Sequence, residues 1–154
     1  MKTTKTIFAP YLMLVYAVIG MAIAAYDCYM IYTGQLLWCP PPIDGCNTVA
    51  YSPYGRIYGV PIGYFGLIFY FIMFALAALL VFGSSSRGLR LAALFYTAIG
   101  VCGSIGFMYL DLTLIRAFCI YCLISAILTI LLLLSAIMHF RAPVNGHRLT
   151  TKKG

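Results

Sequence analysis

The stretch PIGYFGLIFYFIMFALAALLVF, residues 61–82, decides the fold. It contains no Asp, Glu, Lys or Arg, and the uncharged interval around it extends from Ile57 to Ser86. A helix needs about 20 consecutive apolar residues to cross the hydrocarbon core of a bilayer. Water is absent there, so backbone groups must pair within the segment, and a helix allows this. We therefore predict a transmembrane helix over residues 61–82.

Three further stretches have the same apolar character. Hydrophobic residues make up 64% of the 154-residue chain, charged residues make up 8%, and the mean hydropathy is +1.00. This composition excludes a soluble monomer and a disordered chain. The other predicted helices cover about Tyr11–Ile31, Leu91–Leu110 and Ala117–Met138. The fold class we predict is an all-α membrane protein, a four-transmembrane-helix bundle forming a single domain over residues 1–154, with an extracytoplasmic loop between helices 1 and 2.

The basic residues flank the predicted helices, and their distribution predicts the orientation. With a cytoplasmic amino terminus, that side receives eight Lys and Arg residues, including Lys152 and Lys153, whereas the other side receives only Arg56 and Arg116. The positive-inside rule then places both termini in the cytoplasm, and residues 33–60 and 111–116 outside. Although the net charge is +7, we predict no nucleic-acid partner, because that function gathers basic residues on one face.

The amino-terminal segment allows a second interpretation. Lys2, Lys5, an apolar run and Ala22-Ile23-Ala24 together resemble a cleavable signal peptide. The apolar run continues past Ala24 to Ile31, which favours an uncleaved first helix. Cleavage would leave the rest of the predicted topology unchanged.

Four of the six cysteines gather at the predicted outer face, where disulfides persist. Cys119-Ile120-Tyr121-Cys122 is a CxxC at the start of the fourth helix, where unpaired N–H groups favour a thiolate. Arg116 adds a nearby positive charge. A structural disulfide is the alternative interpretation of this motif. For Cys28 and Cys102, which have no sequence-near partner, we expect a packing role.

The loop contains the second pair, Cys39 and Cys46. Pro40-Pro41-Pro42 and the turn Asp44-Gly45 stiffen the segment between them, so a bridge across a tight loop is feasible. Two cysteine pairs on one face indicate a relay by thiol–disulfide exchange. A metal site is not expected, because the Cys39–Cys46 spacing is too wide for zinc and the loop has no histidine.

The cysteine pairs and the residues around them resemble a known family. The features that carry the resemblance are Cys39, Cys46-Asn47-Thr48-Val49, Ser52-Pro53-Tyr54, Tyr58-Gly59-Val60-Pro61 and the CxxC. They resemble the vitamin K epoxide reductase family in its bacterial form, over about Tyr11–Phe140. The resemblance implies a membrane thiol:quinone oxidoreductase that supports disulfide-bond formation, in a bacterial inner membrane. It also implies a separate thioredoxin-like thiol oxidase as partner, because this chain ends at Gly154 without a fused thioredoxin-like domain.

The resemblance also implies a role for each site residue. Cys39 would meet the partner, Cys46 would exchange with Cys119, and Cys122 would face the quinone, which is ubiquinone, menaquinone or a related molecule. Ser52 matches the family's serine near the active site; an ordinary loop serine is the alternative. Ile62 and Ala126 stand where the animal enzymes have a quinone-binding asparagine and a tyrosine. The resemblance therefore favours quinone reduction over epoxide reduction.

The predicted second helix offers aromatic walls for a quinone pocket, and small residues for close helix contact. The candidates are Tyr64, Phe65, Phe69, Tyr70 and Phe71, with Gly63 and Gly66. Ordinary packing against lipid and neighbouring helices is the alternative, with the tyrosines at positions 51, 54, 58 and 64 as an interfacial belt. Two other functions stay open: a non-enzymatic membrane protein with structural disulfides, and the other four-helix thiol oxidase family of the same pathway. The latter carries its CxxC in the first outer loop, which argues against it here.

Overall fold

The computed structural model describes residues 2–41, 45–83 and 86–141 of the chain. Four helices in this part are long and apolar enough to cross a membrane, as predicted. They are α1 (Lys2–Thr33), α3 (Ile62–Phe82), α4 (Arg87–Leu110) and α5 (Ile120–Arg141). Some residues that entered the predictions above lie outside the described residues: Pro42, Asp44, Lys152, Lys153 and Gly154.

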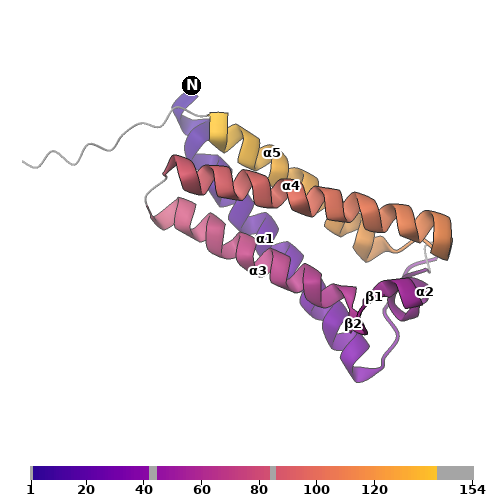
Figure 1. Ribbon diagram of the computed structural model, residues 1–154. Coiled ribbons are helices and arrows are strands. Elements are labelled where there is room, and N and C mark those ends of the chain that lie inside the picture. Colours follow the sequence, from indigo (N-terminus) through magenta and orange to yellow (C-terminus); the bar gives the residue numbers. More distant parts are fainter. Residues whose placement is uncertain (1, 42–44, 84–85, 142–154) are drawn as a thin grey trace, which may run out of the picture.

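Helix α1 packs most extensively against α3 and α5, and α4 packs mainly against α5. Figure 1 shows the α1–α3 pair and the α4–α5 pair diverging toward the end of the bundle where α2 (Cys46–Tyr51) lies. Toward the opposite end, fully buried apolar side chains such as Met13 and Met73 fill the core. The bundle is therefore packed tightly at one end and hollowed at the other.

Helix bounds differ from the predicted ones where local capping overrides hydropathy. Helix α4 begins at Arg87 rather than Leu91, because the Ser86 hydroxyl accepts the Leu89 N–H at 3.3 Å. Helix α1 begins at Lys2, since a helix continues into polar residues beyond the apolar run. Helix α5 begins three residues later than predicted, because Arg116 adopts φ +53° and interrupts the chain.

The link predicted at 111–116 is not a surface loop. Residues Asp111–Ile115 form η2, a π-helical turn that continues α4, and Asp111 is only 4% exposed. The structure therefore replaces the predicted loop by a helical turn in which Asp111 faces the protein interior, while the side of the membrane on which this turn lies stays a prediction. A π-turn widens the helix locally, and such turns are frequent at functional sites.

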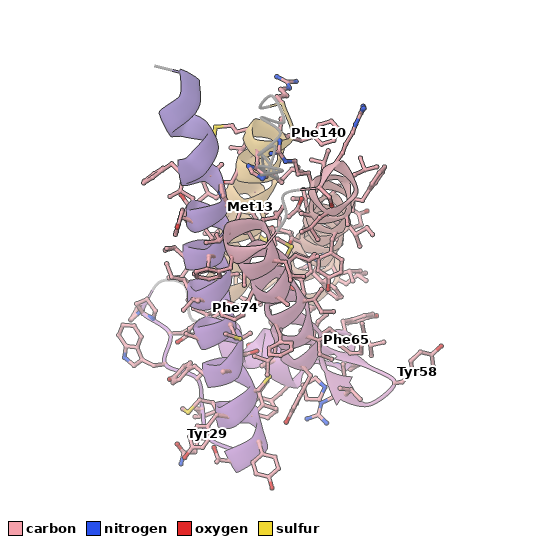
Figure 2. All side chains as sticks on the ribbon, turned by 90° about the vertical axis from the view of Figure 1, so that its left-hand side faces the viewer. Met13, Tyr29, Tyr58, Phe65, Phe74 and Phe140 are labelled. Carbon is pink, nitrogen blue, oxygen red and sulfur yellow. A yellow bond between two sulfur atoms is a disulfide. The ribbon has the colours of Figure 1, made fainter. Side chains whose placement is uncertain are left out.

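The segment between α1 and α3 is folded rather than an open loop. It contains α2, the short 3-10 helix η1 (Pro53–Gly55) and a hairpin of β1 (Arg56–Ile57) and β2 (Val60–Pro61). Arg56 pairs with Pro61 in this antiparallel hairpin. Tyr58 and Gly59 both have positive φ, which a two-residue turn of this hand requires. Figure 2 shows Tyr58 projecting away from the bundle at the hairpin tip.

Candidate active site

The CxxC begins α5, and the first of its sulfurs caps the helix. Cys119 directly precedes the first helical residue, its Sγ accepts the Cys122 N–H at 3.3 Å, and its carbonyl accepts the Leu123 N–H at 3.1 Å. A side chain that satisfies one of the free N–H groups of a first turn is the usual arrangement of a helix cap. The structure thus places the Cys119 sulfur at the positive end of α5, as the sequence predicted.

The pKa of the Cys119 thiol is lowered from its ordinary value. The main cause is the hydrogen bond from the Cys122 thiol, with a smaller contribution from the Cys122 backbone N–H, while burial and the carboxyl groups of Asp27 and Asp111 act in the opposite direction. Arg116, which was expected to contribute, is exposed and is not among the groups that change this pKa. Cys119 is therefore the more readily ionised thiol of the pair, because its CxxC partner donates to it.

The loop cysteines form a disulfide. Cys39 and Cys46 are bonded, with their Cα atoms 6.3 Å apart, whereas Cys119 and Cys122 are free thiols. Cys46, the first residue of α2, is fully buried. The Asn47 side chain fixes the two arms of the loop, since it accepts the Leu37 N–H at 2.7 Å and donates to the Leu37 carbonyl at 3.1 Å.

The oxidised loop lies directly on the start of α5. A methyl group added at Gly45 would sit 2.6 Å from both the N and O atoms of Phe118, so these two backbones touch. The Tyr121 hydroxyl, inside the CxxC, donates to the Trp38 carbonyl at 2.7 Å. As a result Cys46 and Cys119, which follow the touching residues, share one buried cluster.

Ser52 lies just after α2, and its hydroxyl is used locally. It donates to the Val49 carbonyl at 2.9 Å and accepts the Gly55 N–H at 2.9 Å, which joins the end of α2 to η1. Val49 and Gly55 line the cavity described next, but Ser52 does not. The role of Ser52 as a site residue stays a prediction, and in this structure it shapes the loop that forms one wall.

A cavity of about 290 Å³ lies between the two helix pairs at the loop end of the bundle. Cys46, Cys119 and Cys122 line it, together with residues of α1, α3 and α4. Of the predicted aromatic wall, Phe65, Phe69 and Tyr70 line the cavity, while Tyr64 and Phe71 do not. Figure 2 shows Phe65 on the half of α3 nearer the hairpin. Cys122 therefore opens into an apolar, aromatic chamber inside the bundle.

Close helix contacts shape this chamber. The ring of Tyr70 lies against the backbone at Gly20, and its hydroxyl makes a 2.8 Å hydrogen bond with the Ser125 hydroxyl. Phe69 lies against Gly100 and stacks on Tyr96 with ring centroids 5.0 Å apart. Gly63 and Gly66, predicted as contact positions, both line the cavity.

Two acidic residues in the cavity wall were missed by the sequence reasoning. Asp27 of α1 and Asp111 of η2 both line it, and they are two of only three acids in the chain. The sequence did contain a signal for them, because an acidic residue inside or beside a membrane-spanning segment is rare and usually marks a functional site. The sequence reasoning placed Asp111 in an outer link and did not consider Asp27.

The remaining cysteines occupy different surroundings. Cys28 is buried and its sulfur lies near Gly63, where an added methyl would be 3.3 Å from it. Cys102 is exposed on α4. Burial of Cys28 agrees with the packing role expected for it, whereas Cys102 is not buried in the bundle.

Comparisons with known proteins agree with this arrangement. Residues 11–137 match the Vitamin K epoxide reductase family. The chain is 34% identical over 111 residues to Thiol-disulfide oxidoreductase LTO1 of Arabidopsis thaliana, a match that covers 68% of this chain and 30% of LTO1. The chain thus spans less than a third of the length of that relative.

The described part of the chain is a bundle of four helices long and apolar enough to cross a membrane, and two cysteine pairs meet in one buried cluster of this bundle. With the match over residues 11–137, the chain belongs to the Vitamin K epoxide reductase family. The predicted family and fold class are confirmed.

Proposed function

We propose that this protein passes electrons from an external dithiol through Cys39 and Cys46 to Cys119 and Cys122, and from there to a quinone. One observation carries the proposal. The loop disulfide is buried against the CxxC at Cys46, while Cys122 opens into a cavity within the bundle. The two pairs therefore form a continuous path from the loop to an internal chamber.

The exchange steps balance without any further reactant. The partner dithiol reduces the Cys39–Cys46 disulfide and leaves as a disulfide. The Cys46 thiolate then attacks Cys119 of an oxidised CxxC, so that Cys122 leaves with the electron pair. Cys39 next attacks Cys46 and releases Cys119, which its lowered pKa favours as a leaving thiolate. The product has an oxidised loop and a reduced CxxC, which is the redox state of the structure.

The cavity residues fit a quinone head group. The lining is apolar and aromatic, with few polar groups, as binding sites for such ligands are. Gly103 lines the cavity, and a methyl group added there would have nothing within 4 Å, so there is room beside it for a ring. The Asp111 Oδ2 atom has no hydrogen-bond partner among the described residues, so it is available to a polar group of a ligand. Phe65, Phe69 and Tyr70 would hold the ring. A bound ubiquinone, menaquinone or related molecule would supply the two-electron acceptor.

The proposed partner is a thioredoxin-like thiol protein on the outer side of the membrane. Cys39 is only partly buried, and the neighbouring Leu36 and Trp38 are 72% and 71% exposed. These apolar side chains would provide a docking surface beside the bridge. The charge distribution supports cytoplasmic termini.

A membrane-impermeant thiol reagent tests the proposed orientation. Applied to intact cells or spheroplasts after reduction, it should modify Cys39 and Cys46, and through the same face Cys119 and Cys122. Modification of the terminal Lys152 and Lys153 from outside by an impermeant amine reagent would reverse the orientation.

Turnover by the purified protein tests the proposed function. Reduced protein mixed with a short-chain ubiquinone should regain its disulfides and yield hydroquinone. Cys39→Ala should keep quinone reduction with a small dithiol donor and lose it with a thioredoxin-like protein donor. Equal loss with both donors, together with unfolding, would instead make the loop bridge structural.

A further inference from the structure

Two carboxyl groups line the cavity beside the CxxC, and the exchange steps above do not use them. Asp27 belongs to α1 and Asp111 begins η2, so they reach the cavity from different elements. Acidic side chains within membrane-spanning helices are rare and mark proton or ion pathways. Their position beside two redox-active thiols suggests proton transfer.

The geometry of Asp111 makes it available for this role. Its side chain is 4% exposed, it interacts with the Cys122 thiol, and its Oδ2 atom has no hydrogen-bond partner within residues 2–41, 45–83 and 86–141. An unpaired buried carboxylate is costly, and accepting a proton removes that cost. Asp111 therefore combines contact with a reacting sulfur and a free acceptor atom.

Asp27 faces the same space from the opposite wall. A methyl group at Gly63 of α3 would lie 2.6 Å from the Asp27 Oδ2 atom, so this carboxyl reaches across to the α3 side of the cavity. Asp27 and Asp111 both act electrostatically on Cys119 and Cys122. Each thiol of the CxxC thus has carboxyl groups in its immediate surroundings.

The other titratable groups of the cavity are occupied or lie toward its edge. The Tyr70 hydroxyl is bonded to Ser125, the Tyr121 hydroxyl to the Trp38 carbonyl, and Cys46 is in the disulfide. Tyr54 is 49% exposed. None of the described Lys, Arg or His residues lines the cavity. The two carboxyl groups are the proton carriers that remain.

We propose that Asp111 and Asp27 carry the two protons that leave the CxxC when its disulfide forms again. This inference rests on the proposed function. Oxidation breaks two S–H bonds and forms one S–S bond; two electrons pass to the quinone. Asp111 takes the Cys122 proton and Asp27 takes the Cys119 proton. Both protons then go to the two quinone oxygens, so the carboxyl groups return to their starting state.

The first test needs no quinone. Infrared difference spectra between oxidised and dithiol-reduced protein should show a change in carboxyl absorption, because the carboxyl groups respond to the protons on the sulfurs. Asp111→Asn should remove part of this change and Asp27→Asn the rest, while mass mapping of the oxidised variants should find the Cys39–Cys46 bridge formed. A difference spectrum without carboxyl bands, or one unchanged in both variants, would overturn the proposal.

The second test follows reoxidation by a short-chain ubiquinone. Proton transfer by a placed side chain contributes about 100-fold or more, so Asp111→Asn should slow reoxidation roughly 100-fold and alter its pH profile. Asp111→Glu should restore part of the rate. Thr113→Ala is the matched control, since this exposed η2 side chain only donates to the Tyr109 carbonyl of its own helix. It should behave as wild type.

Two results separate this inference from the function on which it rests. If wild type reduces quinone and the Asp111→Asn variant does so at the same rate and with the same pH profile, only the proposed role in proton transfer is overturned. A rate that falls equally at every pH and is not restored by Glu would make Asp111 structural, which also overturns it. Failure of wild-type protein to reduce any quinone would instead overturn the proposed function.

Discussion

The loop pair and the helix pair differ in almost every property except their chemistry. Cys39 and Cys46 are seven positions apart, bonded, and held by side-chain contacts to the surrounding backbone, such as those of Asn47. Cys119 and Cys122 lie within one helical turn, are free, and line a cavity together with two carboxyl groups that act on them electrostatically. The loop pair thus has a partly exposed member in Cys39, whereas the helix pair opens into the cavity at Cys122.

Each pair also divides its own roles between its two members. Cys46 and Cys119 meet in the buried cluster between the pairs. Cys39 lies toward the exposed loop and does not line the cavity, whereas Cys122 does. In the proposed relay, Cys46 and Cys119 exchange with each other, Cys39 reacts with the protein partner, and Cys122 faces the quinone. This comparison teaches that position relative to the cluster, and not the spacing within a motif, assigns the roles.

Replacing Cys122 is expected to have the largest effect on electron transfer between the two cysteine pairs and the quinone. Cys122→Ser leaves Cys119 without a resolving thiol, so turnover with quinone should stop with every donor. A Cys46–Cys119 disulfide should accumulate, because those two sulfurs share the buried cluster. Mass mapping after proteolysis measures the bridge. A Cys39–Cys119 bridge in its place would contradict the assigned order.

Separating the two pairs gives the next largest effect. Gly45 has φ −73° and ψ −3°, a conformation that alanine adopts without strain, so the effect of Gly45→Ala comes from the volume of the added methyl group. Its methyl group would meet the Phe118 backbone at 2.6 Å and push the loop away from α5. Misplacement of reacting atoms by about 1 Å costs roughly 100-fold in rate. Exchange between the pairs should slow by this factor, measured by quenched-flow alkylation and mass mapping.

The matched control for Gly45→Ala is Gly88→Ala on α4. An added methyl there has nothing within 4 Å, and alanine is the better helix former. Gly88→Ala should leave the exchange rate unchanged. Equal rates in the Gly45 variant and this control would show that the backbone contact does not set the approach of Cys46 to Cys119.

The sequence predicted the four helices because their signal is hydropathy, which is local and strong. It could not predict α2, since a helix as short as Cys46–Tyr51 is stable only through the burial of Cys46, Val49 and Ala50 against other elements. The start of α5 was missed because the left-handed conformation at Arg116 carries no sequence signal in a non-glycine residue.

The cysteines of the candidate site could be predicted from the sequence, whereas the residues that contact them could be predicted only in part. The CxxC and the loop pair are visible as motifs, but the contact between Gly45 and Phe118 depends on tertiary structure. The pKa of Cys119 is lowered as expected, yet by its own CxxC partner instead of Arg116. The burial of Asp111 was missed because hydropathy ended the helix at Leu110, where a π-turn continues it.

The two thiols of the helix pair should differ in reactivity with pH. The lowered pKa of Cys119 means that its thiolate fraction, and so its alkylation rate, should reach half-maximum at a lower pH than in a model cysteine peptide. Cys122→Ala removes the hydrogen bond that is the main cause, so the midpoint should move to higher pH. Mass spectrometry of the Cys119 peptide measures both profiles. Coincident profiles in wild type and variant would contradict this cause.

The smallest expected effect concerns the hydrogen bond between the two regions. Tyr121→Phe keeps the ring contact with Tyr26, whose centroid lies 5.9 Å away, and removes the 2.7 Å bond to the Trp38 carbonyl together with the interaction of the hydroxyl with the Tyr26 side chain. Such a bond contributes about 1 kcal/mol, a factor of roughly five in an equilibrium. The loop should therefore dissociate from α5 more often, and exchange between the pairs should slow by up to this factor in the same quenched-flow experiment. Tyr29→Phe is the control, because Tyr29 is 61% exposed and lies at the α1 end shown in Figure 2. If Tyr121→Phe matched this control, the loop would be held on α5 by the Gly45 contact and the buried cluster alone.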